Sequence, residues 1–373
     1  MSNWQSFKKK HVLLMNAAFT VAIPAAVWLI MELLNLAFCG VHTLNSTVDY
    51  TTLMRNLVTS FCFALGLNCN LPVGRMDTST GSQMYLACII GGNIALSLNL
   101  GGVGVLVFSM LFGMLAGGFV GFLFINMRIL PMVLGLGISL VYECISFSMY
   151  NQQGLNLFGK PGVSILSNWG FIIVVTLLVM LVMTYLFQYS GFGYNRRATQ
   201  GNQKLAHDAG INIYKNAFLC YVAAGALVAI AGVFDTAYKS SLVPVLGMNS
   251  NSTVFANMFP MAVGVWLAKK SNPGVGSLSV QFLILGLAKF TAIGVSDYMQ
   301  TCIKYSVWLI FMIYRMNEDK FDHIKAKHAR IALARKTRAQ RAVAAYPNIS
   351  GAGQKRPAPH FLVKREEVGG EEN

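Results

Sequence analysis

Long apolar runs separated by short polar segments cover most of the chain. A helix that crosses a membrane needs roughly 20 mostly apolar residues, and ten runs are candidates by hydropathy. They occupy residues 12–38, 53–67, 83–98, 102–125, 131–149, 169–187, 217–234, 254–268, 278–293 and 302–314. The runs are apolar on all sides, rich in glycine and without the strict alternation of barrel strands, which favours helices. The pattern therefore predicts an all-α, polytopic transmembrane helical bundle of about ten spans.

Lys8, Lys9 and Lys10 precede the first run, a layout that is also found in secretory signal peptides. The run is longer than the apolar region of a signal peptide, and further spans follow it. We therefore expect it to remain in the membrane as the first transmembrane helix.

The distribution of lysine and arginine predicts the orientation. If Lys8–Lys10 lie in the cytoplasm, ten crossings place the other basic clusters there too, and cytoplasmic loops carry an excess of these residues. The clusters are Arg75, Arg128, Arg196 and Arg197 with Lys204, Lys269 with Lys270, and Arg315 onward. The predicted outer loops are poor in lysine and arginine. The sequence thus predicts a multi-pass protein of the plasma or inner membrane with both termini cytoplasmic.

The composition supports a membrane protein, and the positive net charge can be explained without a nucleic-acid partner. Only 12% of the residues are charged, about half the share of a soluble domain. The net charge of +15 is confined to short clusters between apolar runs and to the C-terminal region. This arrangement is typical of cytoplasmic loops that face anionic lipid.

The composition of the chain changes from apolar to basic and polar near its C-terminus. Residues 320–341 contain eight basic residues and one acidic residue, and residues 347–373 contain proline and glycine. We expect a transmembrane domain at 1–315 and a basic, partly disordered cytoplasmic tail at 316–373. The basic stretch is either a helix lying on membrane lipid or a solvated extension.

Motifs for catalysis and cofactor binding are missing from the sequence. It contains no GxxxxGK[ST] phosphate loop, no HExxH or GxSxG motif and no paired carboxylates. The seven cysteines form no CxxC or Cys/His cluster. We expect no catalytic residue, no metal site and no cofactor bound by this chain.

Four ionisable residues fall inside predicted spans: Glu32, Arg55, Glu143 and Lys289. A charge within a membrane is costly, so each is a candidate for function. Glu32 and Arg55 are close enough to span ends to reach the interface. Glu143 is retained as a candidate residue of a translocation path.

Two polar segments interrupt the apolar pattern. Residues 71–82, LPVGRMDTSTGS, form an abrupt polar break. Irregular polar backbone near lipid is tolerated only where it lines a cavity or lies outside the membrane. The alternative is an ordinary turn capped by Asp77 or Ser79.

The second segment, residues 195–215, is the longest predicted inner loop before the tail. Its alanine, leucine, lysine and glutamine favour a short helix, with Gly210 as a stop signal. Such a helix would offer a surface to a cytoplasmic partner; the alternative is a simple connector.

These two segments resemble the motifs of the ABC-importer permease family that moves simple sugars of the ribose, xylose and galactose type. The resemblance extends from about Thr52 to Tyr314, with the motifs in the same order. In the first motif the matching residues are Gly74, Asp77, Ser79, Gly81 and Ser82. In the second they are Gly201, Asn202, Ala206, Ala209, Gly210, Ile211 and Asn212.

The resemblance implies a type II-like importer permease. Residues 195–215 would be the coupling helix, with Lys204 and Asp208 beside the matching positions, docked on an ABC ATPase subunit that carries ATP and Mg. Two permease subunits, identical or homologous, would surround the path and receive the solute from an extracytoplasmic substrate-binding protein. Gly74, Asp77, Ser79, Gly81, Ser82 and Glu143 are the candidate path residues.

The sequence also departs from the family, and the departures leave the solute open. Arg75 and Met76 stand where the family has glycine and isoleucine, and Lys269-Lys270 replaces a small, glycine-rich turn. A simple sugar is the expected solute; a nucleoside or a branched-chain amino acid is the alternative. An ion-coupled secondary transporter would need intramembrane carboxylates, for which Asp77 and Glu143 are available. A non-transporting receptor or scaffold acting through the basic tail is a further alternative.

Overall fold

The computed structural model describes residues 12–127, 129–267 and 274–318, together with 320, 323, 326–328, 330–334 and 337. The basic residues Lys8–Lys10, Arg128, Lys269 and Lys270 lie outside the described residues. The chain forms two compact units, Met1–Ser306 and Val307–Asn373. The unit boundary therefore falls inside the last helix of the membrane domain. The account below concerns the first unit.

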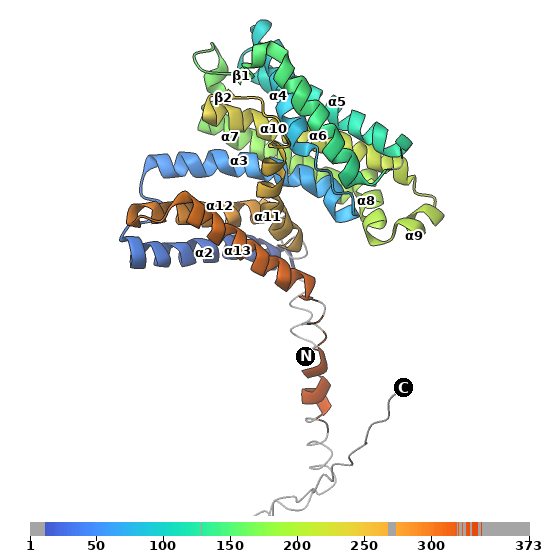
Figure 1. Ribbon diagram of the computed structural model, residues 1–373. Coiled ribbons are helices and arrows are strands. Elements are labelled where there is room, and N and C mark those ends of the chain that lie inside the picture. Colours follow the sequence, from blue (N-terminus) through green and yellow to red (C-terminus); the bar gives the residue numbers. More distant parts are fainter. Residues whose placement is uncertain are drawn as a thin grey trace, which may run out of the picture. The chain divides into compact units, whose positions relative to one another are not determined.

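Helices make up nearly all of this unit (Figure 1). The N-terminal half contains α2 (Val12–Cys39), α3 (Thr47–Asn70), η1 (Leu71–Val73), α4 (Thr80–Ser97), α5 (Gly101–Met127), α6 (Pro131–Ser148), η2 (Met149–Gln152) and η3 (Val163–Ser167). The C-terminal half contains α7 (Trp169–Thr184), η4 (Tyr185–Tyr189), α8 (Gly191–Gly201), α9 (Gln203–Asp208), α10 (Ile213–Lys239), α11 (Asn251–Leu267), α12 (Gly274–Lys289), η5 (Phe290–Ile293) and α13 (Asp297–Met316). Two short strands, β1 (Leu155–Asn156) and β2 (Ser241–Leu242), complete it.

Each of the ten predicted spans overlaps one long helix, and the spans 169–187 and 278–293 continue into the short helices η4 and η5, so the all-α prediction is confirmed. Within the part of the chain that the structure describes, seven helices are long and apolar enough to cross a membrane. The helices α4, α11 and α13 do not reach that criterion of length and hydropathy. For α4 the reason is visible in the sequence, because its first turn contains Thr80, Ser82 and Gln83.

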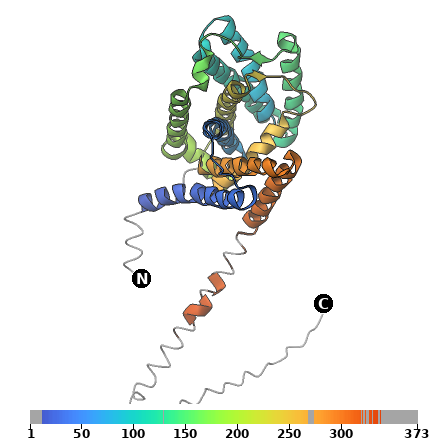
Figure 2. The same ribbon diagram turned by 90° about the vertical axis from the view of Figure 1, so that its left-hand side faces the viewer.

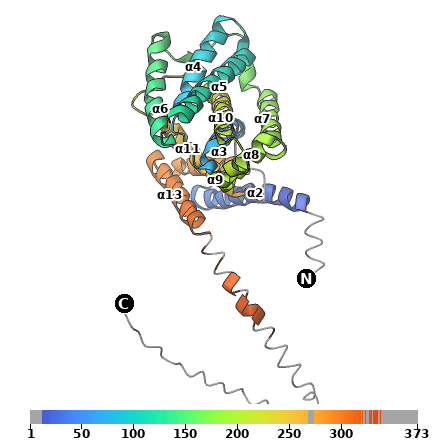
Figure 3. The same ribbon diagram turned by 90° about the vertical axis from the view of Figure 1, so that its right-hand side faces the viewer.

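The helix α10 forms the centre of the bundle and packs against α3, α4 and α5. Glycines allow the closest approach: a Cβ on Gly225 of α10 would lie 2.0 Å from the Gly113 carbonyl oxygen of α5. A Cβ on Gly117 would lie 2.3 Å from the Tyr221 carbonyl oxygen. The glycine spacing of α5 therefore serves helix packing, as small residues do between membrane helices. Figure 2, viewed nearly along α3, and Figure 3, from the opposite side, show the helices gathered around this core.

The outward faces of several helices are apolar. Leu115 of α5, Val133 of α6 and Leu181 of α7 are all more than half exposed, whereas Ser109, Ser139 and Ser146 are fully buried. A water-soluble protein would reverse this distribution. The surface is suited to hydrocarbon.

The short antiparallel sheet connects two distant loops. Leu155 pairs with Leu242 and Asn156 pairs with Ser241. The first loop follows α6 and the second follows α10. These loops were both predicted on the outer side, and the pairing places them at the same end of the bundle.

Candidate coupling and translocation site

The polar turn between η1 and α4 is built around Asp77. Its carboxylate accepts hydrogen bonds from the Ser79 backbone N–H at 2.9 Å, the Ser79 hydroxyl at 2.5 Å and the Gln83 side-chain amide at 3.1 Å. The first backbone N–H groups of a helix have no intrahelical partner, and a nearby carboxylate stabilises that end. The Ser82 hydroxyl donates to the Ser79 carbonyl oxygen at 2.8 Å. Asp77 thus fixes the turn that leads into α4, although α4 begins without the side-chain cap that the capped-turn alternative predicted.

This turn is packed between other segments. Asp77, Ser79 and Ser82 are buried, whereas Gly74, at φ 80°, is exposed. A Cβ on Gly81 would lie 2.2 Å from the Ser250 carbonyl oxygen, so that position has no room for a side chain. In this conformation the first motif forms a helix junction.

Glu143 lies at the same junction. It belongs to α6, is 1% exposed and accepts hydrogen bonds from the backbone N–H groups of Met248 at 2.8 Å and Ser250 at 2.9 Å. Met248 has φ 64°, a strained conformation for a residue with a side chain. The carboxylate therefore holds the strained loop that precedes α11. Ser250 connects the two predicted groups, since its N–H contacts Glu143 and its carbonyl oxygen lies against Gly81.

The predicted coupling segment consists of two helices, because asparagine side chains interrupt it. The Asn202 side-chain oxygen accepts the Leu205 N–H at 3.1 Å and begins α9. After Gly210, at φ 82°, the Asn212 side-chain oxygen accepts the Lys215 N–H at 2.9 Å and begins α10. Asparagine competes with a continuous helix through such local bonds. Residues 213–215 consequently belong to the long central helix.

The helix α8 is bonded to the end of α3 through Arg196. The guanidinium donates to the Cys69 carbonyl oxygen at 3.2 Å, to the Asn68 side-chain oxygen at 3.1 Å and to the Asn68 carbonyl oxygen. It also lies over the Phe187 ring, 4.7 Å from the ring centroid. Burial lowers the pKa of Arg196 from its ordinary value, and the like charge of Arg75 adds to this effect. A guanidinium stays charged under such a shift.

A second bond comes from the start of α9. The Gln203 side-chain amide donates to the Val73 carbonyl oxygen of η1 at 3.1 Å. Figure 3 shows α8 and α9 beside the end of α3. The sequence identified Arg196 only as a basic residue and did not single out Gln203. Nothing in the sequence distinguishes the buried Arg196 from the exposed Arg197 next to it.

The surface of α8 and α9 opposite these bonds is open. Most of the predicted coupling residues are exposed there: Gly201, Asn202, Lys204, Asp208, Ala209, Gly210 and Asn212. Ala206 is buried and Ile211 is half-buried. A groove of about 660 Å³ between the two helices is lined by Tyr194, Arg197, Leu205 and other residues. The side chains of Tyr194 and Leu205 project into solvent, and exposed apolar residues beside polar ones suit a protein partner.

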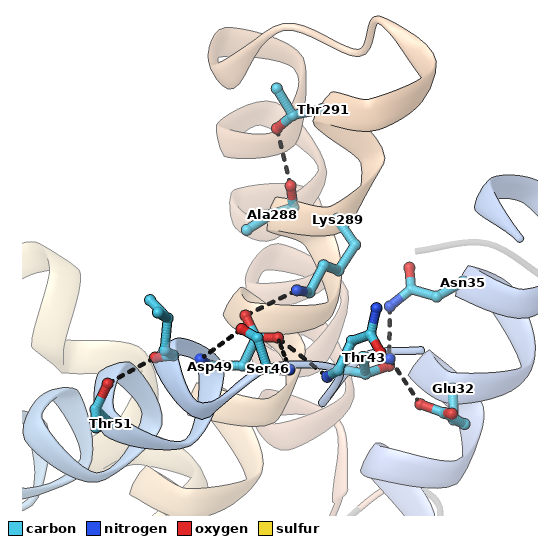
Figure 4. Close-up of polar contacts among 11 residues, drawn as sticks. Glu32, Asn35, Thr43, Ser46, Asp49, Thr51, Ala288, Lys289 and Thr291 are labelled. Carbon is cyan, nitrogen blue, oxygen red and sulfur yellow. Dashed lines mark hydrogen bonds and ion pairs between the residues drawn. The ribbon is translucent and has the colours of Figure 1, made fainter. Parts of the chain in front are cut away.

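Two of the remaining ionisable candidates, Glu32 and Lys289, lie in a separate cluster at the start of α3, which we call the α3 start cluster (Figure 4). Lys289 of α12 forms an ion pair with Asp49 at 2.7 Å, and Glu32 of α2 contacts His42 at 2.6 Å. Glu32 also accepts the Thr43 N–H at 2.9 Å. These contacts join α2, α3 and α12.

Arg55 lies elsewhere, with its guanidinium 5.8 Å from the centroid of the Tyr238 ring on α10. The structure thus gives Glu32, Arg55, Glu143 and Lys289 each a defined partner within the fold.

Comparison with known proteins identifies the family. The family model described as "Branched-chain amino acid transport system / permease component" matches residues 50–313. The chain belongs to this permease family. The matched range contains the polar turn, α8, α9 and the loop around Ser250, so the whole junction lies within it. As a family member the chain is a membrane transport subunit and not an enzyme.

Two relatives are carbohydrate permeases. The ribose import permease protein RbsC of Escherichia coli K12 is 23% identical over 260 residues, which cover 67% of this chain and 80% of that protein. The D-allose transport system permease protein AlsC of the same strain is 23% identical over 240 residues, which cover 56% and 70%. No solved structure matches the chain.

Proposed function

We propose that this chain is the membrane-spanning subunit of an ATP-driven importer for a simple sugar. The observation that carries the proposal is the unit formed by α8 and α9. One side of it is hydrogen-bonded to the end of α3 and to η1, and the other side is an open groove with exposed apolar residues. The names of the ribose and allose permeases support the solute class.

In this proposal, ATP and Mg are bound by a separate ATPase subunit that docks on α8 and α9. Movement of the ATPase displaces the two helices, and Arg196 and Gln203 transmit the displacement to the end of α3 and to η1. The turn around Asp77 begins directly after η1. Ser250 and Glu143 then connect this turn to α6 and to the loop before α11.

The residues Asp77, Ser79, Gly81, Ser82 and Glu143 act here as a junction that couples helix movements, and Gly74 is its exposed hinge. A second permease, identical or homologous, completes the path, and an extracytoplasmic binding protein delivers the solute. This arrangement favours an importer over an ion-coupled transporter, because the hydrogen bonds of Asp77 and Glu143 are already used within the fold.

Contacts between loops support an orientation with both termini in the cytoplasm. Loops predicted on the inner side contact one another, as Gln203 contacts Val73. Loops predicted on the outer side also contact one another, as β1 pairs with β2. The lysine and arginine distribution then assigns the end with α8 and α9 to the cytoplasm.

Uptake of labelled ribose and allose by cells that express the full chain with its native partners tests the proposal. Uptake should require ATP and should persist when the proton gradient is collapsed. Saturable uptake of a nucleoside or a branched-chain amino acid, with none of either sugar, would overturn the solute class. Sugar uptake that survives ATP depletion and stops with the proton gradient would overturn the importer mechanism.

Charge reversal tests the coupling surface. Lys204→Glu should reduce uptake strongly because it reverses a charge on the proposed docking surface of α9. The residue is exposed, so the core should not be disturbed. Lys160→Glu, an exposed change at the opposite end of the bundle, is the matched control and should leave uptake intact. Equal uptake by the two variants and the unmodified chain would count against α9 as the docking element.

A further inference from the structure

The helices α5, α7 and α10 form an apolar groove of about 400 Å³ (Figure 3). Every residue that lines it is apolar, including Met114 of α5 and Phe192 of α8. Leu178 and Val182 of α7 and Leu219 of α10 line the groove and are each more than a third exposed, so it opens to the surrounding lipid. Water needs polar partners, and a space of this kind stays dry. The groove is therefore suited to an apolar occupant.

The groove occupies one half of the membrane domain. Near the start of α7, this helix contacts α10, where the Phe171 and Phe234 ring centroids are 6.5 Å apart. The lining residues of α7 and α10 lie toward the opposite end, at 178–183 and 219–230. The α10 portion is roughly 16 Å long, about half the thickness of the hydrocarbon core. In the orientation proposed above, this half lies in the cytoplasmic leaflet.

A basic residue lies at the mouth of the groove. Lys215 precedes Leu219 by four residues and Val222 by seven, a spacing that places the three side chains on one face of α10. A helical side chain leans toward the helix N-terminus, so Lys215 extends beyond the apolar wall toward the end of the bundle. Lys215 is exposed, and no ion pair of the described residues includes it. Residues 191–215 contain four basic residues and one acidic residue, so the charge beside the mouth is positive.

We propose that an anionic phospholipid binds here, with an acyl chain in the groove and its phosphate at Lys215. Anionic lipids are found in the cytoplasmic leaflet, where they attract basic residues. The length of the groove matches a chain that spans one leaflet. A transmembrane helix of a second permease would instead need a groove along the whole thickness of the hydrocarbon core. This lipid site does not depend on which solute is transported.

The groove reaches the ring pair that supports Arg196. Phe192 lines the groove and stacks on Phe187, with ring centroids 6.4 Å apart. The Arg196 guanidinium lies over the Phe187 ring, 4.7 Å from its centroid. An acyl chain in the groove therefore packs against the rings that position Arg196, and it stabilises the attachment of α8 to the end of α3.

Native mass spectrometry of the purified full chain tests the site, because it reports bound lipids and the oligomeric state together. The protein is titrated with phosphatidylglycerol, which is anionic, and with phosphatidylcholine, which carries no net charge. A single phosphatidylglycerol per chain should bind in preference. Ala226→Phe places a ring in the groove and should abolish this adduct, whereas Leu115→Phe, a lipid-facing change on α5, should retain it. Lys215→Gln should weaken phosphatidylglycerol binding roughly fivefold.

Equal binding of the two lipids by the unmodified chain would overturn the proposal, as would an undiminished phosphatidylglycerol adduct in Ala226→Phe. If Ala226→Phe does not fold, Lys215→Gln decides the matter, with Lys160→Gln as the exposed control at the opposite end of the bundle. Loss of lipid selectivity in Lys215→Gln alone is the expected result, and equal selectivity in both variants would reject the site. Conversion of a dimer into a monomer by Ala226→Phe, with lipid binding unchanged, would make the groove a subunit interface instead.

Discussion

The two ends of α3 differ in the groups that neighbour their positively charged side chains. At its start, Lys289 pairs with Asp49 and His42 contacts Glu32, so positive groups meet carboxylates. At its end, Arg196 is bonded to an amide and to backbone carbonyl oxygens, and two donor atoms of Arg75 have no partner. The helix has 24 residues, so the two ends are roughly 36 Å apart.

Of the two ends of α3, only the start balances its charges with groups among the described residues of the same chain. The α3 start cluster compensates its own charges and fastens α2, α3 and α12 together. The end of α3 holds an excess of positive charge and carries the helices with the open groove. We infer that movement is transmitted at the end of α3, while the start acts as a fixed point.

The largest effect is expected from removing Arg196, which bonds α8 to the end of α3. Arg196→Met should destabilise the protein by about 3 kcal/mol, because buried carbonyl oxygens lose a charged donor. It should also abolish uptake by detaching α8 from α3. Thermal unfolding and uptake measure the two effects, with Arg197→Met as the exposed control. A stable Arg196→Met protein with normal uptake would show that this attachment is dispensable.

The next largest effect is expected at the junction of α6 with the loop before α11. Glu143→Gln removes the negative charge that faces the Met248 and Ser250 N–H groups, and its amide can offer only one oxygen. We expect a loss of about 2 kcal/mol in the free energy of unfolding, measured by denaturation. Glu143→Ala should lose more. An unchanged stability in both variants would contradict the role of the carboxylate in holding the loop.

The ion pair in the α3 start cluster should matter less. Lys289→Met and Asp49→Asn, combined in a double-mutant cycle, should give a coupling free energy of about 1 kcal/mol for this partly buried pair. Uptake should remain close to normal, since the fixed end does not transmit movement. If the two single-mutant effects sum to that of the double mutant, the ion pair contributes nothing to the free energy of unfolding. A severe loss of uptake with intact stability would contradict the division between the two ends.

The smallest effect on stability should come from Gln203. Gln203→Ala removes one neutral hydrogen bond to Val73, worth about 1 kcal/mol. Uptake should nevertheless fall several-fold, because α9 loses its bond to η1. Gln153→Ala, an exposed change in the loop before β1, is the control. Loss of stability and uptake in the same proportion would indicate a purely structural role for Gln203.

Hydropathy predicted the helical elements well. Each apolar run became one helix, because a backbone in hydrocarbon must satisfy its own hydrogen bonds. Gly113 and Gly117 of α5 allow close packing against α10, which small residues commonly provide between membrane helices. Asp77 hydrogen-bonds within its own turn, but the predicted cap is absent, because the N-cap residue Ser79 makes no capping hydrogen bond.

Partners that are distant in sequence could not be predicted. Lys289 and Asp49 are 240 positions apart, and hydropathy alone made Lys289 a candidate functional residue inside a span. Ser250, which connects Gly81 to Glu143, has no distinctive sequence signal. The break at Asn202 was missed because asparagine is tolerated inside helices, and its capping role depends on the local backbone. Tertiary packing determines these side-chain partners and the position of the helix break.

The central claim is that α8 and α9 form the docking surface for an ATPase. It is tested most directly by purifying the tagged chain from its native membrane and identifying by mass the proteins that accompany it. We predict an ATPase with phosphate-loop domains beside the unmodified chain, and its loss from Asp208→Lys but not from Lys160→Glu. A chain that emerges alone, or an ATPase retained equally by both variants, would contradict the account.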